Sequence, residues 1–324
     1  MIFARGIFLS KPRLICLDSI LIILIFLVSC QKESIIESDL LLPINTLYET
    51  IENKDTDSTI YISDNILIND KVKARDTLFS YDNYERFIGR LVKSNRFIFV
   101  PHNEFETTFS KDKIVISLRH DIDYDINSAL RFARREHKLG VRATYFVLHT
   151  ADYYGVTSVG ITTRNPSVYK YLRKIQNEYG HEIGWHNDLV TLQVIYNIDP
   201  EKYLKNELKR LKSNGIHISG SAYHGSEYCY KYHYLNSFFW KNYGPSSIFY
   251  NYNSVPVNGQ NIIIKKYVNS DFGFTYEAGK LNFNHFYADV FFFNNKRWHM
   301  NMEDWSSLKP GDRVIILTHS ALWD

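Results

Sequence analysis

Apolar runs alternate with amphipathic segments through the middle of the chain. Near-continuous apolar runs, typical of strands buried on both faces of a parallel sheet, occupy 113–119, 142–148, 182–185, 217–223 and 313–318. Apolar residues at helical spacing occupy the segments between several of these runs, at 127–139, 165–180 and 199–215. This alternation of strands and helices predicts a parallel α/β sheet or barrel.

The expected helices carry recognisable end signals. Asn165-Pro166 and Asp199-Pro200 each place an N-capping residue before a proline, which the first turn of a helix accepts. Gly140, Gly180 and Gly215 follow the last helical turns, where glycine readily adopts the left-handed conformation. The helices are therefore delimited by local chemistry as well as by periodicity.

The first 29 residues read as a secretory signal peptide. Residues 20–28 are all apolar, but nine residues are too few to span a bilayer, which takes about 20. Basic residues precede this run, as in signal peptides. The sequence from Leu27 to Cys30 resembles a bacterial lipobox, so we expect Cys30 to be lipidated and to become the mature N-terminus. The alternatives are an ordinary signal peptide or a weak anchor helix.

The rest of the chain divides in two by composition. Residues 30–77 are polar with weak periodicity, and we interpret them as a tether between a membrane and a folded domain. Residues 78–324 are richer in apolar and aromatic residues and form the expected domain. Together these features predict an exported lipoprotein of the bacterial cell envelope, attached through lipid rather than through charge.

Composition and charge exclude several classes. The 324 residues are 45% hydrophobic and 23% charged, as in a globular protein, and the formal net charge is only +3. Without a dense basic stripe or a glycine-rich phosphate loop, we expect neither nucleic acid nor nucleotide as a partner. Of the three cysteines, Cys229 would be left without a partner after processing at Cys30, so no disulfide framework is expected.

Titratable side chains follow the predicted strands where they end. Because the carboxyl ends of parallel strands meet at one edge of a sheet or barrel, these side chains should share a site. They are His120 to Asp123 after the first strand, His186 to Asp188 after the third, His224 after the fourth, and His319 after the last.

The spacing of these residues suggests a metal site. Residues two apart in an extended segment lie on one face, which groups Arg119, Asp121 and Asp123, and separately His186 and Asp188. A mixed cluster of histidine and carboxylate ligands suits zinc or another divalent ion with an open position for water. Two nearby carboxylates also allow one to bind metal and the other to accept a proton.

Three segments carry a resemblance to a known family. The block from Ile114 to Val147, the segment Gly180–His186 and the segment Arg313–His319 resemble motifs of the polysaccharide deacetylase family of carbohydrate esterases. The resemblance implies a distorted (β/α) barrel of about seven strands. It also implies a metal-dependent enzyme that removes N- or O-acetyl groups from a glycan.

The resemblance also implies roles for single residues. Asp121 matches the general base and Asp123 the metal-binding aspartate of the family. His186 matches the first metal histidine, and His319 matches the general acid that protonates the leaving group.

The match fails at one metal ligand. The second metal histidine of the family falls four residues after the first, and that position is Val190 here. Asp188, by strand parity, and His224, from another strand, are both candidates for the missing ligand. Two other departures are Ile122, which separates the paired aspartates, and the absence of an arginine-containing third motif. These departures favour a divergent branch, and they keep open a non-catalytic glycan-binding lipoprotein and a metal-dependent amidase or lyase.

Aromatic residues near the motifs are candidates for binding a sugar. Trp185 is a candidate for stacking on a sugar ring, and core packing is its alternative. Tyr223 opens a tyrosine-rich stretch that ends at Tyr252, which predicts either a carbohydrate groove or a small core of its own. Arg119 is expected near the substrate, or paired with Asp121.

Overall fold

The computed structural model describes residues 77–243, 250–293 and 296–323. The signal peptide over 1–29, the tether as far as residue 76 and the lipidation site at Cys30 lie outside the described residues, so they stay predictions. None of the helices in the described part of the chain is long and apolar enough to cross a membrane.

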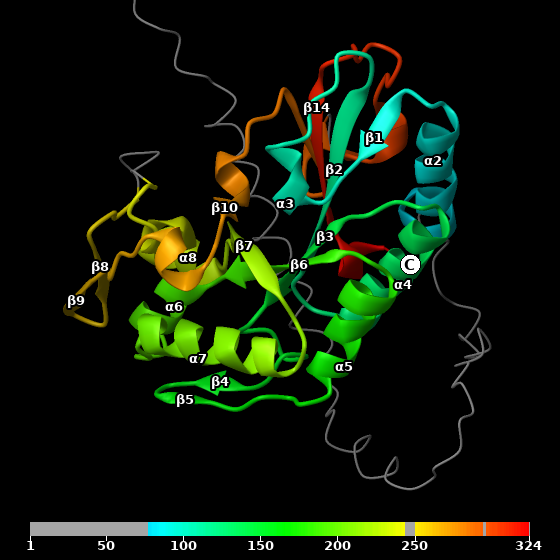
Figure 1. Ribbon diagram of the computed structural model, residues 1–324. Helices are drawn as coiled ribbons and strands as arrows, with labels where there is room; N and C mark the ends of the chain where they lie inside the picture. The colour runs from blue at the N-terminus through cyan, green and yellow to red at the C-terminus, as the bar shows by residue number, and fades with distance from the viewer. Residues whose placement is uncertain (1–76, 244–249, 294–295, 324) are drawn as a thin grey trace, which may run out of the picture.

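One parallel sheet forms the centre of the domain (Figure 1). Its strand order is β10-β7-β6-β3-β2-β14-β11. The short strand β1 pairs with the first part of β2, along the same edge of β2 that pairs with β3 nearer its end. In the described chain β10 and β11 do not pair, so the curled sheet is an open half-barrel, and the predicted α/β barrel-like fold is confirmed. The strands are β1 (Phe97–Phe99), β2 (Ile114–Ile122), β3 (Thr144–Leu148), β6 (Glu182–Asn187), β7 (Ile218–Tyr223), β10 (Tyr276–Glu277), β11 (His285–Ala288) and β14 (Arg313–His319).

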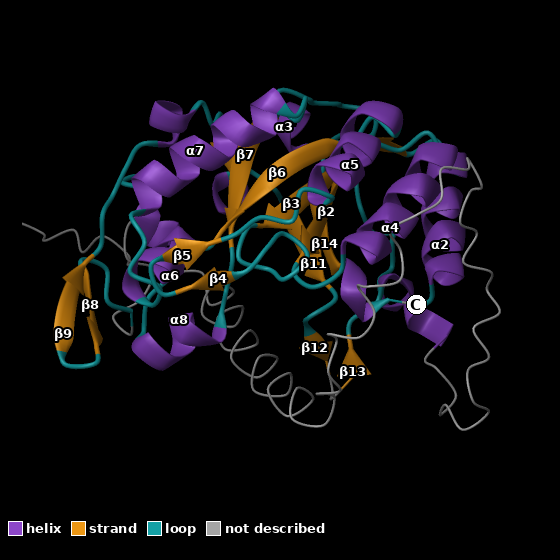
Figure 2. Ribbon diagram, turned by 90° about the horizontal axis from the view of Figure 1, so that it is seen from below, coloured by secondary structure: helices purple, strands orange, loops and turns teal. Residues whose placement is uncertain are grey.

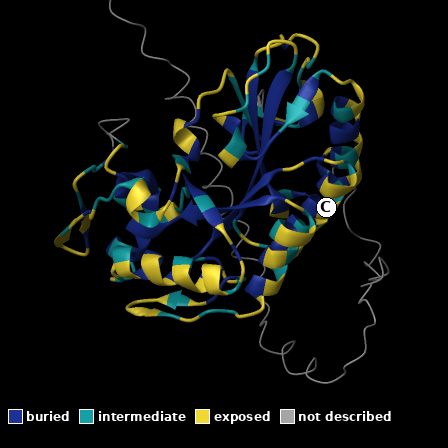
Figure 3. Ribbon diagram, in the orientation of Figure 1, coloured by how far each residue is buried: buried dark blue, intermediate teal, exposed yellow. Residues whose placement is uncertain are grey.

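Helices cover the outer side of the sheet. Figure 2 shows α7, α5, α4 and α2 along an arc outside the strands, and Figure 3 shows their exposed faces turned away from the buried sheet. The helices are α2 (Tyr81–Lys93), α3 (His102–Phe105), α4 (Ile126–Lys138), α5 (Val168–Arg173), α6 (Leu189–Val194), α7 (Pro200–Ser213) and α8 (Glu227–Tyr232). Short hairpins pair β4 (Thr157–Ser158) with β5 (Ile161–Thr162), β8 (Ser254–Val257) with β9 (Gln260–Ile263), and β12 (Phe292–Phe293) with β13 (Lys296–Arg297).

Strand parity separates the core from the site. On β2, the outward side chains, such as Ile116 and Leu118, join the large core that the helices cover. His120 also faces outward, and its Nε2 lies 2.7 Å from Oε1 of Glu136 on α4. The alternate residues, including Arg119, face the inside of the half-barrel, because side chains of a strand alternate between its two faces.

Two glycines make room for aromatic rings inside the half-barrel. A Cβ atom on Gly184 of β6 would overlap the ring of Phe146, and one on Gly220 of β7 would overlap the ring of Tyr276. Both rings therefore pack directly against strand backbone.

Most expected elements are present, with ends shifted by a few residues. The expected helix over 165–180 is divided, since α5 ends at Arg173 and a π-helical turn follows over Lys174–Glu178. The short strands β1, β10 and β11 were not expected, because segments of two to four residues carry little periodicity.

Candidate metal centre and active site

Four strands deliver side chains to one end of the half-barrel. Asp121 lies near the end of β2, and His319, the last residue of β14, is its register partner. His186 lies near the end of β6, whose neighbour β7 is followed by His224. The convergence expected from the sequence is therefore present in the structure.

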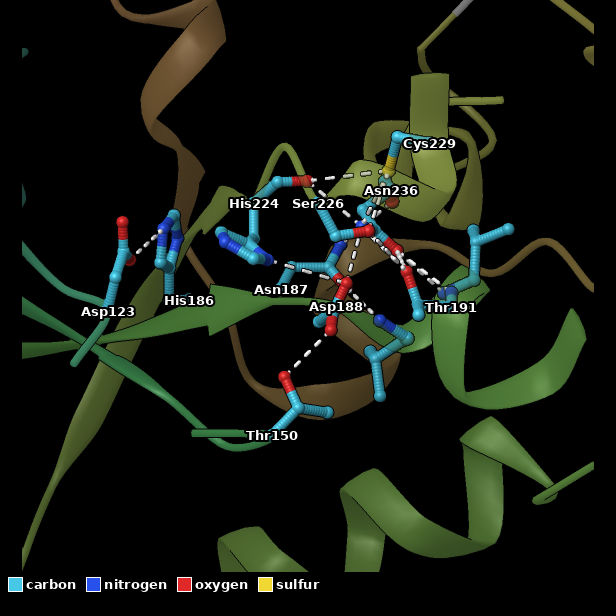
Figure 4. Close-up of polar contacts among 12 residues, drawn as sticks. Asp123, Thr150, His186, Asn187, Asp188, Thr191, His224, Ser226, Cys229 and Asn236 are labelled. Carbon is cyan, nitrogen blue, oxygen red and sulfur yellow. Dashed lines mark hydrogen bonds and ion pairs between the residues drawn. The ribbon is translucent and has the colours of Figure 1, made fainter. Parts of the chain in front are cut away.

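Asp123, His186 and His224 form a compact group of potential metal ligands. One ligand atom from each residue lies within 4.8 Å of the others. His186 Nε2 is 3.2 Å from Asp123 Oδ1, and the two histidine rings have centroids 5.0 Å apart (Figure 4). Two imidazoles and one carboxylate form a ligand set that zinc and similar divalent ions bind while keeping a position open.

The orientation of His186 fits a bound cation. Its Nδ1 lies 3.0 Å from the carbonyl oxygen of Ala222, so Nδ1 donates there and Nε2 keeps its lone pair. That lone pair faces Asp123, whose Oδ1 is buried without a hydrogen-bond partner. Two facing acceptors with no proton between them suit a metal ion.

Asp188 lies behind His224 and outside the ligand group. Its Oδ2 accepts a hydrogen bond from Thr150 Oγ1 at 2.7 Å, and its Oδ1 accepts one from Asn236 Nδ2 at 2.7 Å. The alternation of side chains along a strand does not apply to Asp188, because β6 ends at Asn187 and α6 begins directly after Asp188. Val190, at the position of the missing histidine, is fully buried. Of the two sequence candidates, the structure brings His224 to the group.

Asp121 is held by Arg119 on the same strand. Arg119 donates from Nε to Oδ1 at 2.8 Å and from Nη2 to Oδ2 at 2.7 Å. Burial raises the pKa of Asp121, but Arg119 and then His186 lower it more, so its pKa is below the usual value. The carboxylate is thus ionised at neutral pH and can accept a proton. Arg119 contacts Asp121 instead of reaching free solvent.

His319 is oriented by Asp289, a residue that the sequence analysis missed. His319 Nδ1 lies 2.7 Å from Asp289 Oδ1, and the His319 backbone N–H donates to Oδ2 at 2.8 Å. Burial lowers the pKa of His319, but the charge and hydrogen bond of Asp289 raise it to about 9. With this pKa the ring favours a proton on both nitrogens at neutral pH. Nε2 lies 3.8 Å from Asp123 Oδ2, at the edge of the ligand group. The available signal was an acidic residue directly after β11, a strand that was not expected.

Of the expected sugar-binding residues, Trp185 lies in the core, whereas Tyr223 lies within electrostatic reach of Arg119 and Asp121. Trp185 faces the helices, is fully buried and stacks on His149 with centroids 4.5 Å apart, so its ring is covered by protein on the core side of the sheet. The physical reason is parity, because His186 faces inward and its neighbour must face outward. Tyr223 is half-buried, and its ring packs edge-on against Tyr243.

The described part of the tyrosine-rich stretch packs into the large core that the helices cover. Its largest side chains are fully buried, and the hydroxyl of Tyr234 donates to Thr191 on α6 at 2.9 Å. These buried side chains do not line a carbohydrate groove, and they join the main core instead of forming a small core of their own. The buried members are Tyr234, Phe238, Phe239 and Trp240.

Comparison with solved structures finds two similar proteins. One is IcaB from Ammonifex degensii, with 15% identity and a TM-score of 0.30, covering 47% of this chain and 70% of that one. The other is a family 4 carbohydrate esterase from Bacillus anthracis, with 13% identity and a TM-score of 0.30, covering 72% of this chain and 76% of that one. No family profile and no curated protein matches the chain.

Proposed function

We propose that this protein is a metal-dependent hydrolase that removes acetyl groups from an N- or O-acetylated glycan of the cell surface. One observation supports the proposal most. A potential ligand group of two histidines and one aspartate has two neighbours. One is a buried carboxylate that an arginine holds in place, and the other is a histidine that a further carboxylate holds in place. These residues are Asp123, His186, His224, Asp121 and His319.

The residues divide the proposed reaction between them. A divalent ion held by the ligand group would polarise the acetyl carbonyl and acidify a water molecule. Asp121, ionised and 3.4 Å from His186 Nε2, is placed to accept the proton of the attacking water. His319, whose pKa Asp289 raises to about 9 and whose Nε2 lies 3.8 Å from Asp123 Oδ2, is placed to donate a proton to the leaving amine or alcohol.

The substrate and the location are inferred from the sequence alone. The glycan follows from the motif resemblance, and attachment to the membrane follows from the lipobox that ends at Cys30. Labelling of expressing cells with a radioactive fatty acid tests the anchor. We expect label on the wild-type protein and none on Cys30→Ala, and label on both proteins would contradict lipidation at Cys30.

Metal content is the first test of the proposed activity. We expect elemental analysis of the purified full-length chain to show one divalent ion per chain, with none in Asp123→Ala/His186→Ala. Acetate release from acetylated glycan oligomers should follow the metal content. The absence of metal after incubation with zinc would overturn the proposal.

A non-catalytic glycan-binding protein is the second candidate, and Val190 is the observation that favours it. Valine cannot bind a metal at the position where the resemblance implies a second metal histidine. In this structure the imidazole of His224 completes the ligand group instead. The variant Asp121→Asn distinguishes the two candidates. A glycan-binding protein keeps its affinity for sugar in this variant, and neither the wild type nor the variant releases acetate.

A further inference from the structure

We propose that Asp188 positions His224 for metal binding, and that Asn236 makes this possible by capping helix α6 in place of Asp188. The inference rests on the metal site of the proposed function. The spacing of Asp188 in the sequence made it a candidate metal ligand. The inference instead makes it a residue that positions a ligand.

Asp188 occupies the N-cap position of α6 but does not cap the helix. Its side chain makes no capping hydrogen bond. Instead, Asn236 Oδ1 accepts from the backbone N–H of Val190 at 3.0 Å and of Thr191 at 3.1 Å. An aspartate at this position normally accepts such bonds itself, as Asp199 does for α7. The amide of Asn236 therefore releases the Asp188 carboxylate for another partner.

That partner is the ring of His224. His224 Nδ1 is buried without a hydrogen-bond partner, and the nearest carboxylate oxygen is Asp188 Oδ1 at an ion-pair distance of 3.5 Å. Figure 4 shows the ring between Asp188 on one side and His186 on the other. A carboxylate on one ring nitrogen fixes the tautomer and turns the other nitrogen toward the metal. Cation binding at the far nitrogen makes the Nδ1–H more acidic and strengthens its attraction to Asp188.

The Asp188 carboxylate is engaged by protein donors on both oxygens. Asn236 Nδ2 donates to Oδ1 and Thr150 Oγ1 donates to Oδ2, each at 2.7 Å, and the residue is only 3% exposed. These donors favour a positioning role over direct ligation of an ion.

Asn236 also holds the backbone of His224. Its Nδ2 lies 2.9 Å from the His224 carbonyl oxygen, and the His224 N–H donates to the carbonyl of Asn187 at 2.9 Å. Asn236 is fully buried. One amide side chain thus connects the start of α6, the Asp188 carboxylate and the backbone of the proposed ligand. This network gives His224 a fixed position although it follows a strand and lies on a loop.

The test measures metal affinity directly. Zinc affinity of the full chain is determined by competition with a chelator, and the cobalt-substituted protein gives a spectrum that reports ligand geometry. We expect Asp188→Asn to keep one ion per chain, with affinity about 10- to 100-fold lower and an altered cobalt spectrum. Thr150→Val, which removes one partner of Asp188 and keeps its charge, should weaken zinc binding less and in the same direction. Asp199→Asn, a cap on another helix, is the matched control and should leave affinity unchanged.

The outcomes separate this inference from the proposed function. If Asp188→Asn and Thr150→Val bind zinc as the wild type does, while His224→Gln loses it, the metal site stands and the positioning role is wrong. If Asp188→Asn loses the ion and His224→Gln keeps it, Asp188 is the ligand and the inference is overturned. A wild-type chain that binds no ion overturns the metal site and the inference together.

Discussion

Arg119 and Asp121 form a two-point ion pair within a single strand, with Nε 2.8 Å from Oδ1 and Nη2 2.7 Å from Oδ2. The pair is possible because residues two apart on β2 share the inward face. Both side chains are buried, and the guanidinium also lies over the ring of Phe146, with Cζ 5.3 Å from the centroid. The proposed base is therefore positioned from within its own strand.

Removal of the arginine should leave a buried, unpaired carboxylate. We expect Arg119→Met to lower the free energy of unfolding by about 3–5 kcal/mol, because one partner of a buried ion pair loses its compensation. Urea denaturation measures this loss. The control is Arg142→Met, which breaks an exposed pair with Glu104 and should cost less than about 1 kcal/mol. Equal losses in the two variants would contradict a stabilising role for the Arg119–Asp121 pair.

The proposed base and acid should be separable from the metal site. We expect Asp121→Asn and His319→Ala each to lower acetate release by about 10²- to 10⁴-fold while metal content stays at the wild-type level. Initial-rate kinetics and elemental analysis of the same samples check this. Asp304→Asn, at an exposed position, is the control and should retain activity. Full activity in both site variants would show that the reaction uses other residues.

Asp289 should act only through His319. We expect Asp289→Asn to lower kcat strongly, because an amide no longer fixes the Nδ1–H of His319 and no longer supplies the negative charge that favours a second proton on Nε2. In the His319→Ala background the same substitution should have almost no further effect, since residues that act as a unit are not additive. A double variant whose losses multiply would show that Asp289 has an independent function.

Gly184 should tolerate no larger residue while Phe146 is present. We expect Gly184→Ala to lower the free energy of unfolding by about 1–3 kcal/mol, because the added methyl group overlaps the Phe146 ring. Phe146→Leu in the same chain should recover part of the loss. Gly89 of α2 is the control, because a methyl group added there makes only an ordinary contact with Leu139, so Gly89→Ala should be neutral or stabilising. Thermal and urea denaturation decide between these outcomes, and an unaffected Gly184→Ala variant would contradict the close packing.

His102 should make the protein less stable in acid. Burial, and then the charge of Arg119, lower the pKa of His102 to about 3, whereas an unfolded histidine titrates near 6.5. Between these values the unfolded state binds the extra proton, so stability is fully present above pH 6.5 and falls as the pH drops toward 3.

His102→Gln should therefore show a shallower loss of unfolding free energy than the wild type between pH 6.5 and 4. Urea denaturation across this range measures the slope. His137→Gln, at an exposed position, should keep the wild-type slope. An unchanged slope in His102→Gln would show that His102 does not contribute to the acid sensitivity.

The sequence predicted the main strands and their helices because their signals are local. A buried parallel strand such as β2 is an apolar run, and a helix such as α7 begins at Asp199-Pro200 and is followed by Gly215. The convergence of Asp121, His186 and His319 was also predictable, since every parallel strand of one sheet ends at the same edge. Strand parity on β2 correctly grouped Arg119 with Asp121.

The tertiary structure decided what depends on packing between distant segments. The choice of His224 over Asp188 follows from the turn after β6 and from Asn236, which lies 48 residues beyond Asp188. Asp289 reaches His319 only because β11 pairs with β14, and a four-residue strand leaves no clear pattern. Trp185 is in the core because its strand has helices on its outer face. Sequence periodicity determined which residues could meet the site, and long-range packing, which no local pattern encodes, determined which of them do.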